Sequence, residues 1–193
     1  MFLNSLNLYR QKLFILLISL GCFCFLGHVL YGAEINKKAP DFKAIDSYGK
    51  EHQLSRYKGK IVILEWKNVG CPFVKKHYKS NNMQTLQKEA VDDGMVWLSV
   101  VSSVKGKQGY QDFDKTNKQV KKEGSFASAV LIDEMGDLGR LYQAKVTPHM
   151  YIIDQKGILV YKGAIDNIRS TKIKDVPIAK NFVKEALLQL RAN

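Results

Sequence analysis

The chain has 193 residues, of which 46% are hydrophobic, and a formal net charge of +12. This length suits one domain with at most an extension, and the hydrophobic content excludes a disordered chain. Three cysteines cannot form a fully paired disulfide scaffold. The positive charge alone is ambiguous, because it suits a nucleic-acid partner, an anionic membrane surface or a soluble basic surface.

Residues 1–33 read as a separate segment. They carry Arg10 and Lys12 but no acidic residue, followed by an apolar stretch over 13–30 and small residues at 32–33. This pattern predicts an export signal, and an uncleaved membrane anchor is the alternative, because the apolar run approaches the length of a span. We therefore expect residues 34–193 to form one exported domain, in the periplasm or anchored to the inner membrane and facing the periplasm.

Removal of this segment changes both the cysteine count and the charge. Cys22 and Cys24 lie within it, so Cys71 is the only thiol of the remaining domain. Because the segment holds two of the 30 basic residues and none of the 18 acidic ones, the charge falls from +12 to +10. The lysines are spread along the domain with no basic helix, so we expect no nucleic-acid partner.

Apolar runs and helical patterns alternate along the domain. Strands are expected at residues 61–64, 95–101 and 129–132, with a closing hairpin at 150–153 and 158–161. Helices are expected after Cys71, from Asn82, over about 111–122, and from Asp175 to the end with Pro177 in the first turn. This order predicts an α/β sandwich with helices on both faces of a mixed sheet.

Cys71 stands at the junction between a buried strand and a helix. Pro72 follows it, and proline is favoured at the first helical position, so Cys71 is expected at the N-cap. Free backbone N–H groups and the helix dipole stabilise a thiolate there, and Lys75 lies one turn further on the same face. We therefore interpret Cys71 as a reactive thiol, in preference to an inert buried cysteine.

Two polar residues precede Cys71. Glu65 interrupts the apolar strand, and a carboxylate there could exchange protons with the thiol or merely pair with a lysine at the strand end. Asn68 could hydrogen-bond a bound peroxide or thiol, or form a simple Asx turn. The sequence leaves both pairs of alternatives open.

The chain resembles the thioredoxin-like fold, and more narrowly exported redoxins of the alkyl hydroperoxide reductase/thiol-specific antioxidant (AhpC/TSA) group. The resembling segments are Ala39-Pro-Asp-Phe42, Gly59-Lys-Ile-Val62, Glu65-Trp66, Asn68, Cys71-Pro-Phe-Val-Lys-Lys-His-Tyr78, Asn82-Met83, Ser102-Ser103, Gly106-Lys-Gln-Gly109, Thr147-Pro-His149 and Gly163-Ala-Ile-Asp166.

The resemblance implies a three-layer α/β/α sandwich with a mixed sheet and an N-terminal extension, a buried carboxylate at Glu65, and a cis proline at Pro148 packed against Cys71. It also implies that Thr147 offers backbone groups to the substrate. His149 follows this proline, and strand alternation decides whether its side chain lies near Cys71.

The chain also departs from these families. Val74 occupies the place of the second cysteine of thioredoxins, and peroxiredoxins have Thr or Ser where this chain has Asn68. We therefore expect a thiol-based oxidoreductase that acts on a peroxide or disulfide without a cofactor, and whose Cys71 is resolved by an external thiol or dithiol.

Two other functions remain possible readings of the sequence. Cys71, His77 and His149 are ligand types that suit copper, so a non-enzymatic copper- or thiol-binding module is one alternative. A binding module with a decayed active site is the other.

Overall fold

The computed structural model describes residues 32–192. Most of the predicted export segment, residues 1–33, therefore lies outside the described residues. Within the described part of the chain, no helix has the length and apolarity needed to cross a membrane.

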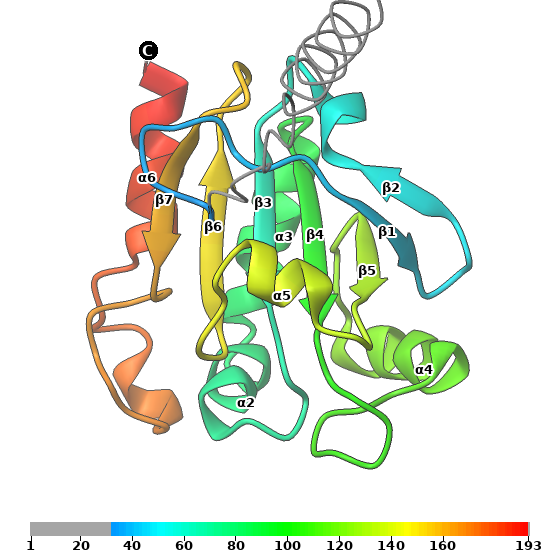
Figure 1. Cartoon of the computed structure of the whole chain (residues 1–193). Helices are drawn as coiled ribbons and strands as arrows, with labels where there is room; N and C mark the ends of the chain where they lie inside the picture. Colours follow the sequence, from blue (N-terminus) through cyan, green and yellow to red (C-terminus); the bar gives the residue numbers. More distant parts are fainter. Residues whose placement is uncertain (1–31, 193) are drawn as a thin grey trace, which may run out of the picture. The chain divides into compact units, whose positions relative to one another are not determined.

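One mixed sheet of seven strands forms the centre of the domain (Figure 1). In chain order the strands are β1 (Lys43–Asp46), β2 (Glu51–Gln53), β3 (Val62–Trp66), β4 (Val96–Val101), β5 (Ala129–Ile132), β6 (His149–Ile153) and β7 (Leu159–Gly163). Their order across the sheet is β2-β1-β5-β4-β3-β6-β7, with β3, β4 and β5 parallel and the outer strands antiparallel. The predicted strands and the predicted hairpin are confirmed.

Helices cover the sheet on both faces. They are α2 (Pro72–Lys79), α3 (Asn82–Asp92), α4 (Phe113–Glu123), α5 (Asp137–Leu141) and α6 (Phe182–Ala192), with short 3-10 turns η1 (Leu54–Tyr57) and η2 (Ile173–Asp175). One core cluster joins the sheet to α2, α3 and α6, and the other joins it to α5, η1 and the segment before β1. The predicted α/β/α sandwich is thereby confirmed.

Side-chain alternation along β3 decides which residues lie beneath α2. Leu64 and Trp66 belong to the cluster beneath α5, whereas Ile63 belongs to the cluster beneath α2 and α3. Glu65 follows Ile63 by two residues, so its side chain also points toward α2 and α3. The carboxylate therefore enters the core on the face that carries the helix after Cys71.

The prediction for the start of the last helix is wrong. α6 begins at Phe182 and not near Asp175, which instead ends the 3-10 turn η2. The Asn181 side chain accepts a hydrogen bond from the Lys184 backbone N–H at 3.0 Å and so supplies the N-terminal cap. Pro177 consequently lies in the connection before the helix. Between β5 and the hairpin the structure also contains the short helix α5.

The segment before β1 is held to the domain by α5. The Ala33 N–H donates to the Leu141 carbonyl at 3.2 Å, and the Tyr142 hydroxyl donates to the Pro40 carbonyl at 2.7 Å. Tyr142 is fully buried and contacts the rings of Phe42 and Trp66. The Tyr142 hydroxyl therefore joins the residue after α5 to the segment before β1.

Tyr142→Phe tests that link. The variant removes one hydroxyl and leaves the Pro40 carbonyl without its donor, so we expect the free energy of unfolding to fall by about 1–2 kcal/mol. Urea denaturation measures the change. Tyr48→Phe is the matched control, because Tyr48 is 73% exposed and should change stability by less than about 0.5 kcal/mol. Equal effects of the two variants would contradict the role of Tyr142.

Candidate active site

Cys71 lies where the chain leaves the sheet and enters α2. It is the N-cap residue of that helix, and Pro72 occupies the first turn, as predicted. The Cys71 N–H donates to the Asn68 carbonyl at 3.0 Å, which closes the preceding turn, and the Cys71 carbonyl accepts from the Lys75 N–H at 3.0 Å. The sequence order strand, turn, cysteine and proline thus sets the thiol at the start of the helix.

The thiol contacts the loop that precedes β6. Cys71 Sγ donates to the Thr147 carbonyl oxygen at 3.1 Å, and the Thr147–Pro148 peptide bond is cis. These residues meet because β3 and β6 are adjacent and antiparallel, with Trp66 opposite His149, so the end of β3 lies beside the start of β6. The structure therefore brings together Cys71, Thr147 and Pro148, as the resemblance implied.

The N-terminus of α2 presents unpaired backbone donors near the thiol. The first turn of α2 contains no acidic residue, and no side chain caps the helix. Its first backbone N–H groups are therefore available to a negative charge at the N-cap, where the helix dipole is also favourable. Cys71 is partly exposed, so a reactant can reach the sulfur.

Asn68 shapes the loop before Cys71. Its Oδ1 accepts from the Gly70 N–H at 2.8 Å, an Asx turn, while its Nδ2 donates to the Gln108 carbonyl at 3.2 Å. A Cβ atom at Gly109 would lie 2.5 Å from the Asn68 side chain, so this approach requires glycine. The geometry thus gives Asn68 a role in positioning the loop, and a contact with substrate stays a prediction.

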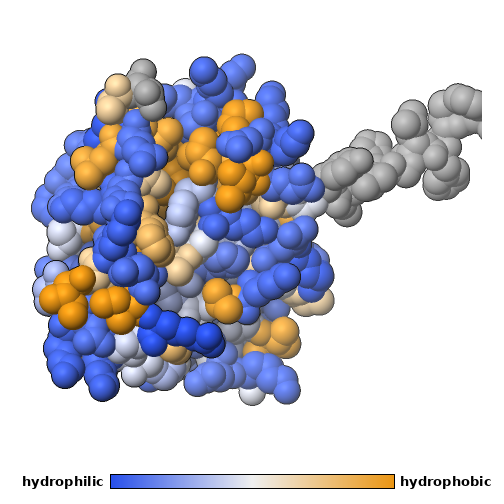
Figure 2. Space-filling view, turned by 90° about the vertical axis from the view of Figure 1, so that its left-hand side faces the viewer, coloured by the Kyte–Doolittle hydropathy of each residue, from blue (hydrophilic) through white to orange (hydrophobic). Residues whose placement is uncertain are grey.

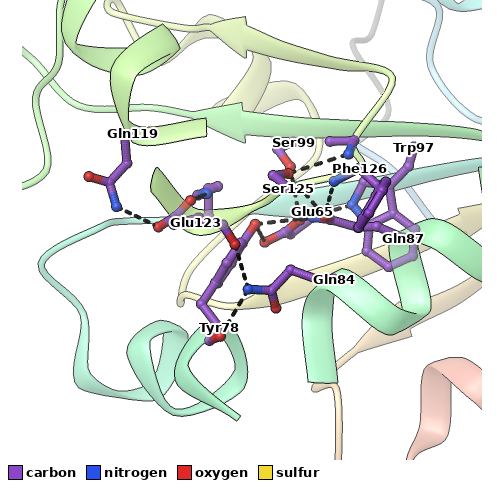
Figure 3. A network of polar contacts seen from close by, with 12 residues as sticks. Glu65, Tyr78, Gln84, Gln87, Trp97, Ser99, Gln119, Glu123, Ser125 and Phe126 are labelled. Atoms are coloured by element: carbon purple, nitrogen blue, oxygen red, sulfur yellow. Dashed lines mark hydrogen bonds and ion pairs between the residues drawn. The ribbon is translucent and has the colours of Figure 1, made fainter. Parts of the chain in front are cut away.

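Glu65 is the centre of a buried polar network (Figure 3). Its carboxylate accepts four hydrogen bonds of 2.8–3.0 Å, from Tyr78, Gln87, Trp97 and Ser99. Both oxygens are engaged, and no hydrogen bond joins them to Cys71 in the described part of the chain. The proton-exchange role expected for Glu65 stays a prediction, and the geometry favours a positioning role.

The same network extends to the end of α4. Lys67 Nζ lies 2.6 Å from Glu123 and 4.0 Å from the centre of the Tyr78 ring. Gln84 donates to the Tyr78 and Glu123 carbonyls at 2.9 and 2.7 Å. Burial, together with the charge of Glu65, raises the pKa of the Tyr78 hydroxyl well above its usual value, so this group stays a donor.

Two adjacent lysines of α2 have different environments. Lys75 is exposed, whereas the next residue, Lys76, is buried and forms a 2.9 Å ion pair with Asp166. His77 is also buried, accepts from the Asn82 amide at Nδ1 and has Nε2 3.5 Å from Asp166. This cluster was not predicted from the sequence, although Asp166 belongs to one of the resembling segments.

His149 lies on the opposite face of the sheet from α2. Its ring packs on Tyr151, two residues along β6, and Nδ1 lies 3.0 Å from the Tyr151 hydroxyl. Burial and the nearby Lys162 and Lys145 lower the pKa of His149 to about 4. His149 therefore belongs to the core beneath α5, and the geometry does not favour the contact with substrate expected for it.

A metal-binding role gains no support from the geometry. Within residues 32–192, no three His, Cys, Asp or Glu side chains are placed to hold a metal ion. His77 and His149 are engaged with Asn82 and Tyr151, respectively, while Cys71 contacts Thr147. The three suggested copper ligands thus do not form a set.

A hollow of about 470 Å³ adjoins the thiol on the α2 side. Phe73, Val146, Pro148 and Ile165 form its apolar lining, and the Lys76–Asp166 pair and Arg169 supply its charged groups. Figure 2 views the face that carries α6 and β7, where the apolar side chains of the lower half form small groups between hydrophilic ones. A reactant that contacts the Thr147–Pro148 segment therefore meets a recess with both apolar and charged walls.

Glu65→Gln tests the positioning role of the buried carboxylate. The amide replaces one acceptor oxygen by a donor, which is unfavourable beside the four donors, so the free energy of unfolding should fall by about 1–3 kcal/mol. The rate of Cys71 alkylation by iodoacetamide at pH 7 should change by less than about twofold, because no hydrogen bond joins Glu65 to Cys71 in the described part of the chain. A tenfold slower alkylation would instead support proton exchange.

The buried histidines predict a fall in stability at acid pH. The pKa of His149 is lowered to about 4, and burial together with Lys76 lowers that of His77 to about 4, against the opposing effect of Asp166. Unfolded histidines titrate near 6.5, so below this pH the unfolded chain binds protons that the folded chain does not.

The free energy of unfolding should therefore be highest above pH 6.5 and decrease, by about 1–3 kcal/mol per histidine, as the pH falls to about 4. Urea denaturation at a series of pH values measures the slope. His77→Gln and His149→Gln should each flatten it, and an unchanged slope in both variants would contradict the prediction.

Comparison with known proteins agrees with the resemblance found in the sequence. The AhpC/TSA family model matches residues 35–162. The chain is 29% identical to the thioredoxin-like protein YneN of Bacillus subtilis (strain 168) over 134 residues, 66% of this chain and 70% of that protein.

The similar solved structures include the following two. An uncharacterized conserved protein from Geobacillus kaustophilus has 23% identity and a TM-score of 0.64, over 70% of this chain and 71% of that one. The pneumococcal exposed lipoprotein thioredoxin Etrx1 from Streptococcus pneumoniae has 25% identity and a TM-score of 0.54, over 80% of this chain and 100% of that one. With the matched family model and the thioredoxin-like fold, these findings show that the chain belongs to the AhpC/TSA family.

Proposed function

We propose that the protein is an extracytoplasmic thiol oxidoreductase that acts on a disulfide or peroxide through Cys71 alone. The observation that carries the proposal is the placement of Cys71. Its sulfur stands at the N-terminus of α2, 3.1 Å from the Thr147 carbonyl and beside the cis proline Pro148. This placement joins a site that stabilises a thiolate to backbone groups that can align a substrate.

With a disulfide, the Cys71 thiolate attacks one sulfur of the substrate. The Cys71–sulfur bond forms as the substrate S–S bond breaks, and the other sulfur leaves as a thiolate. An external thiolate then attacks the substrate-derived sulfur of this mixed disulfide and releases Cys71 as a thiolate. The external thiol and the substrate fragment thereby end as a disulfide, and the protein is unchanged.

With a peroxide, the thiolate attacks one oxygen and the O–O bond breaks. Cys71 becomes a sulfenic acid, and the leaving alkoxide or hydroxide takes up a proton. One external thiol condenses with the sulfenic acid to give a mixed disulfide and water, and a second external thiol reduces that disulfide. Both routes need a thiol from outside, since Val74 occupies the place of a second cysteine.

Substrate alignment would rely on the hollow beside the thiol. The Thr147 backbone lies at its edge, and Phe73 and Ile165 contribute apolar walls. A substrate chain bound there would pass the sulfur of Cys71 while its own backbone pairs with the Thr147 segment. This arrangement favours the disulfide route for substrates that carry an apolar group next to the reacting sulfur.

The location outside the cytoplasm is part of the proposal. It is supported by the cationic and apolar sequence of residues 1–33 and by the similarity to the pneumococcal exposed lipoprotein thioredoxin. The uncleaved alternative would tether the domain to the inner membrane through residues 13–30. Either form leaves Cys71 in an oxidising compartment, where disulfides are available as substrates.

The test is the reactivity of Cys71 in the full-length chain with Cys22 and Cys24 replaced by Ser, purified in a nonionic detergent. At pH 7 we expect iodoacetamide to alkylate Cys71 about tenfold faster than an ordinary cysteine, because the helix N-terminus favours the thiolate. After peroxide and a small thiol, mass spectrometry should find a mixed disulfide on Cys71. Cys71→Ser should abolish the modification and the turnover.

A matched control places the thiol at the other end of the same helix. Ser80 is the C-cap residue of α2, where the helix dipole disfavours a thiolate. In the double variant Cys71→Ser, Ser80→Cys, the thiol at position 80 should therefore react with iodoacetamide more slowly than Cys71 does in the protein without these two substitutions. If the two thiols react equally fast, or if peroxide and disulfides leave Cys71 unchanged, the proposal is wrong.

A further inference from the structure

A basic hollow adjoins the loop that carries Cys71. It measures about 380 Å³ and is lined on one side by Val69 and Gly70, directly before Cys71. On the other side α4 contributes Lys115, Lys118 and Lys122. Residues three and four apart lie on one face of a helix, so these three ammonium groups point the same way.

No acidic side chain lines this hollow. Glu123, at the end of α4, is engaged by the buried Lys67 at 2.6 Å. Asp112 forms an ion pair with Lys115 at 3.4 Å and also interacts electrostatically with Lys118. Within residues 32–192, the side chains of Lys118 and Lys122 form no hydrogen bond or ion pair. The hollow is thus positively charged and has unpaired donors.

Charges along α4 are segregated. Asp112, Asp114 and Glu134 line a separate hollow near the start of the helix, whereas the lysines line the hollow beside Gly70. Grouped charges of one sign in a recess concentrate counter-ions and raise their rate of approach. The recess next to the reactive sulfur should therefore attract anions.

We propose that this hollow receives the carboxylate of a small anionic disulfide while its sulfur reacts with Cys71. The inference rests on the proposed function and adds the charge class of the substrate. The boundary between the hollow and the thiol is the backbone of Val69 and Gly70, and a Cβ at Gly70 would lie 2.8 Å from the Gln108 side chain. Cys71 directly follows Val69 and Gly70 in the chain, so the residue that carries the thiol adjoins the lining of the hollow.

The exchange step keeps the balance given above. The Cys71 thiolate forms a bond to one sulfur, the substrate S–S bond breaks, and the carboxylate-bearing fragment leaves as a thiolate. The lysines take no part in bond making. They raise the local concentration of the anionic disulfide, so they act on its binding and on its rate of approach.

The opposite end of the sheet supplies a matched set of control lysines. Lys58 and Lys60 precede β3, Lys156 lies in the turn between β6 and β7, and all three line another hollow, of about 260 Å³. Val62 at the start of β3 pairs with Ile153 at the end of β6, so this hollow lies at the other end of the strands from Cys71. Figure 1 shows the β6–β7 turn at the end of the sheet opposite α2 and α4.

The experiment compares three simple alkyl disulfides with different charges. Dithiodipropionate is dianionic, bis(2-hydroxyethyl) disulfide is neutral and cystamine is dicationic. The protein is the full-length chain with Cys22→Ser and Cys24→Ser, and each second-order rate of exchange is divided by that of 2-mercaptoethanol with the same disulfide. This division removes the intrinsic reactivity of each probe.

At low ionic strength, we expect the rate relative to 2-mercaptoethanol to be about tenfold higher for the dianionic probe than for the neutral probe. At 0.5 M salt, the relative rates of the two probes should become nearly equal. Lys115→Gln, Lys118→Gln and Lys122→Gln together should reduce the preference to about twofold. The triple variant of Lys58, Lys60 and Lys156 to Gln removes the same charge and should keep the preference. Circular dichroism and urea denaturation confirm that both triple variants are folded.

Three results would overturn the inference. Equal relative rates for the three probes would show that the site has no charge preference, and the proposed function would still stand. An equal loss of preference in both triple variants would assign it to net charge and not to this hollow. Exchange with none of the disulfides, together with no reaction with peroxide, would overturn the inference and the proposed function together.

Discussion

The buried carboxylate of Glu65 is the interaction on which the rest of the site depends. A carboxylate removed from water costs several kcal/mol unless it is hydrogen-bonded, and hydrogen bonds to a charged group contribute about 1.5–3 kcal/mol each. Here four donors come from α2, α3 and β4, all converging on one residue of β3. Because each donor must keep its direction, the network fixes both helices against the sheet.

The place of Cys71 follows from this constraint. Tyr78 binds Glu65 from the last turn of α2, so the first turn of the same rigid helix can occupy only one position at the sheet edge. The Lys76–Asp166 pair holds the next face of α2 to the segment after β7. The thiol, the Thr147 carbonyl and the wall of the adjoining hollow are thus held by contacts that involve none of their own reactive atoms.

Features that depend on the local sequence pattern, such as strand positions and the N-cap of α2, could be predicted from the sequence. Apolar runs predicted the positions of β3 to β7. The pair Cys71-Pro72 predicted the N-cap of α2, because a helix tolerates proline in its first turn but not in its interior. The donors to Glu65 could not be predicted, since they lie 13 to 34 residues away and depend on packing. The burial of Lys76 could not be predicted for a related reason, because it depends on the position of Asp166, 90 residues further along the chain.

Burial also divides the cations near Cys71 into two groups with different effects. Lys67 and Lys76 are buried and each is neutralised by an acidic partner, Glu123 or Asp166, so neither presents net charge to the thiol. What remains near the sulfur is the backbone N-terminus of α2 and the exposed Lys75 one turn further along this helix, and beyond them the exposed lysines of α4. The thiol itself therefore meets mainly main-chain groups, while the unneutralised side-chain charge lies further from it. Net charge over the whole sequence cannot show this division, because it counts neutralised and free lysines alike.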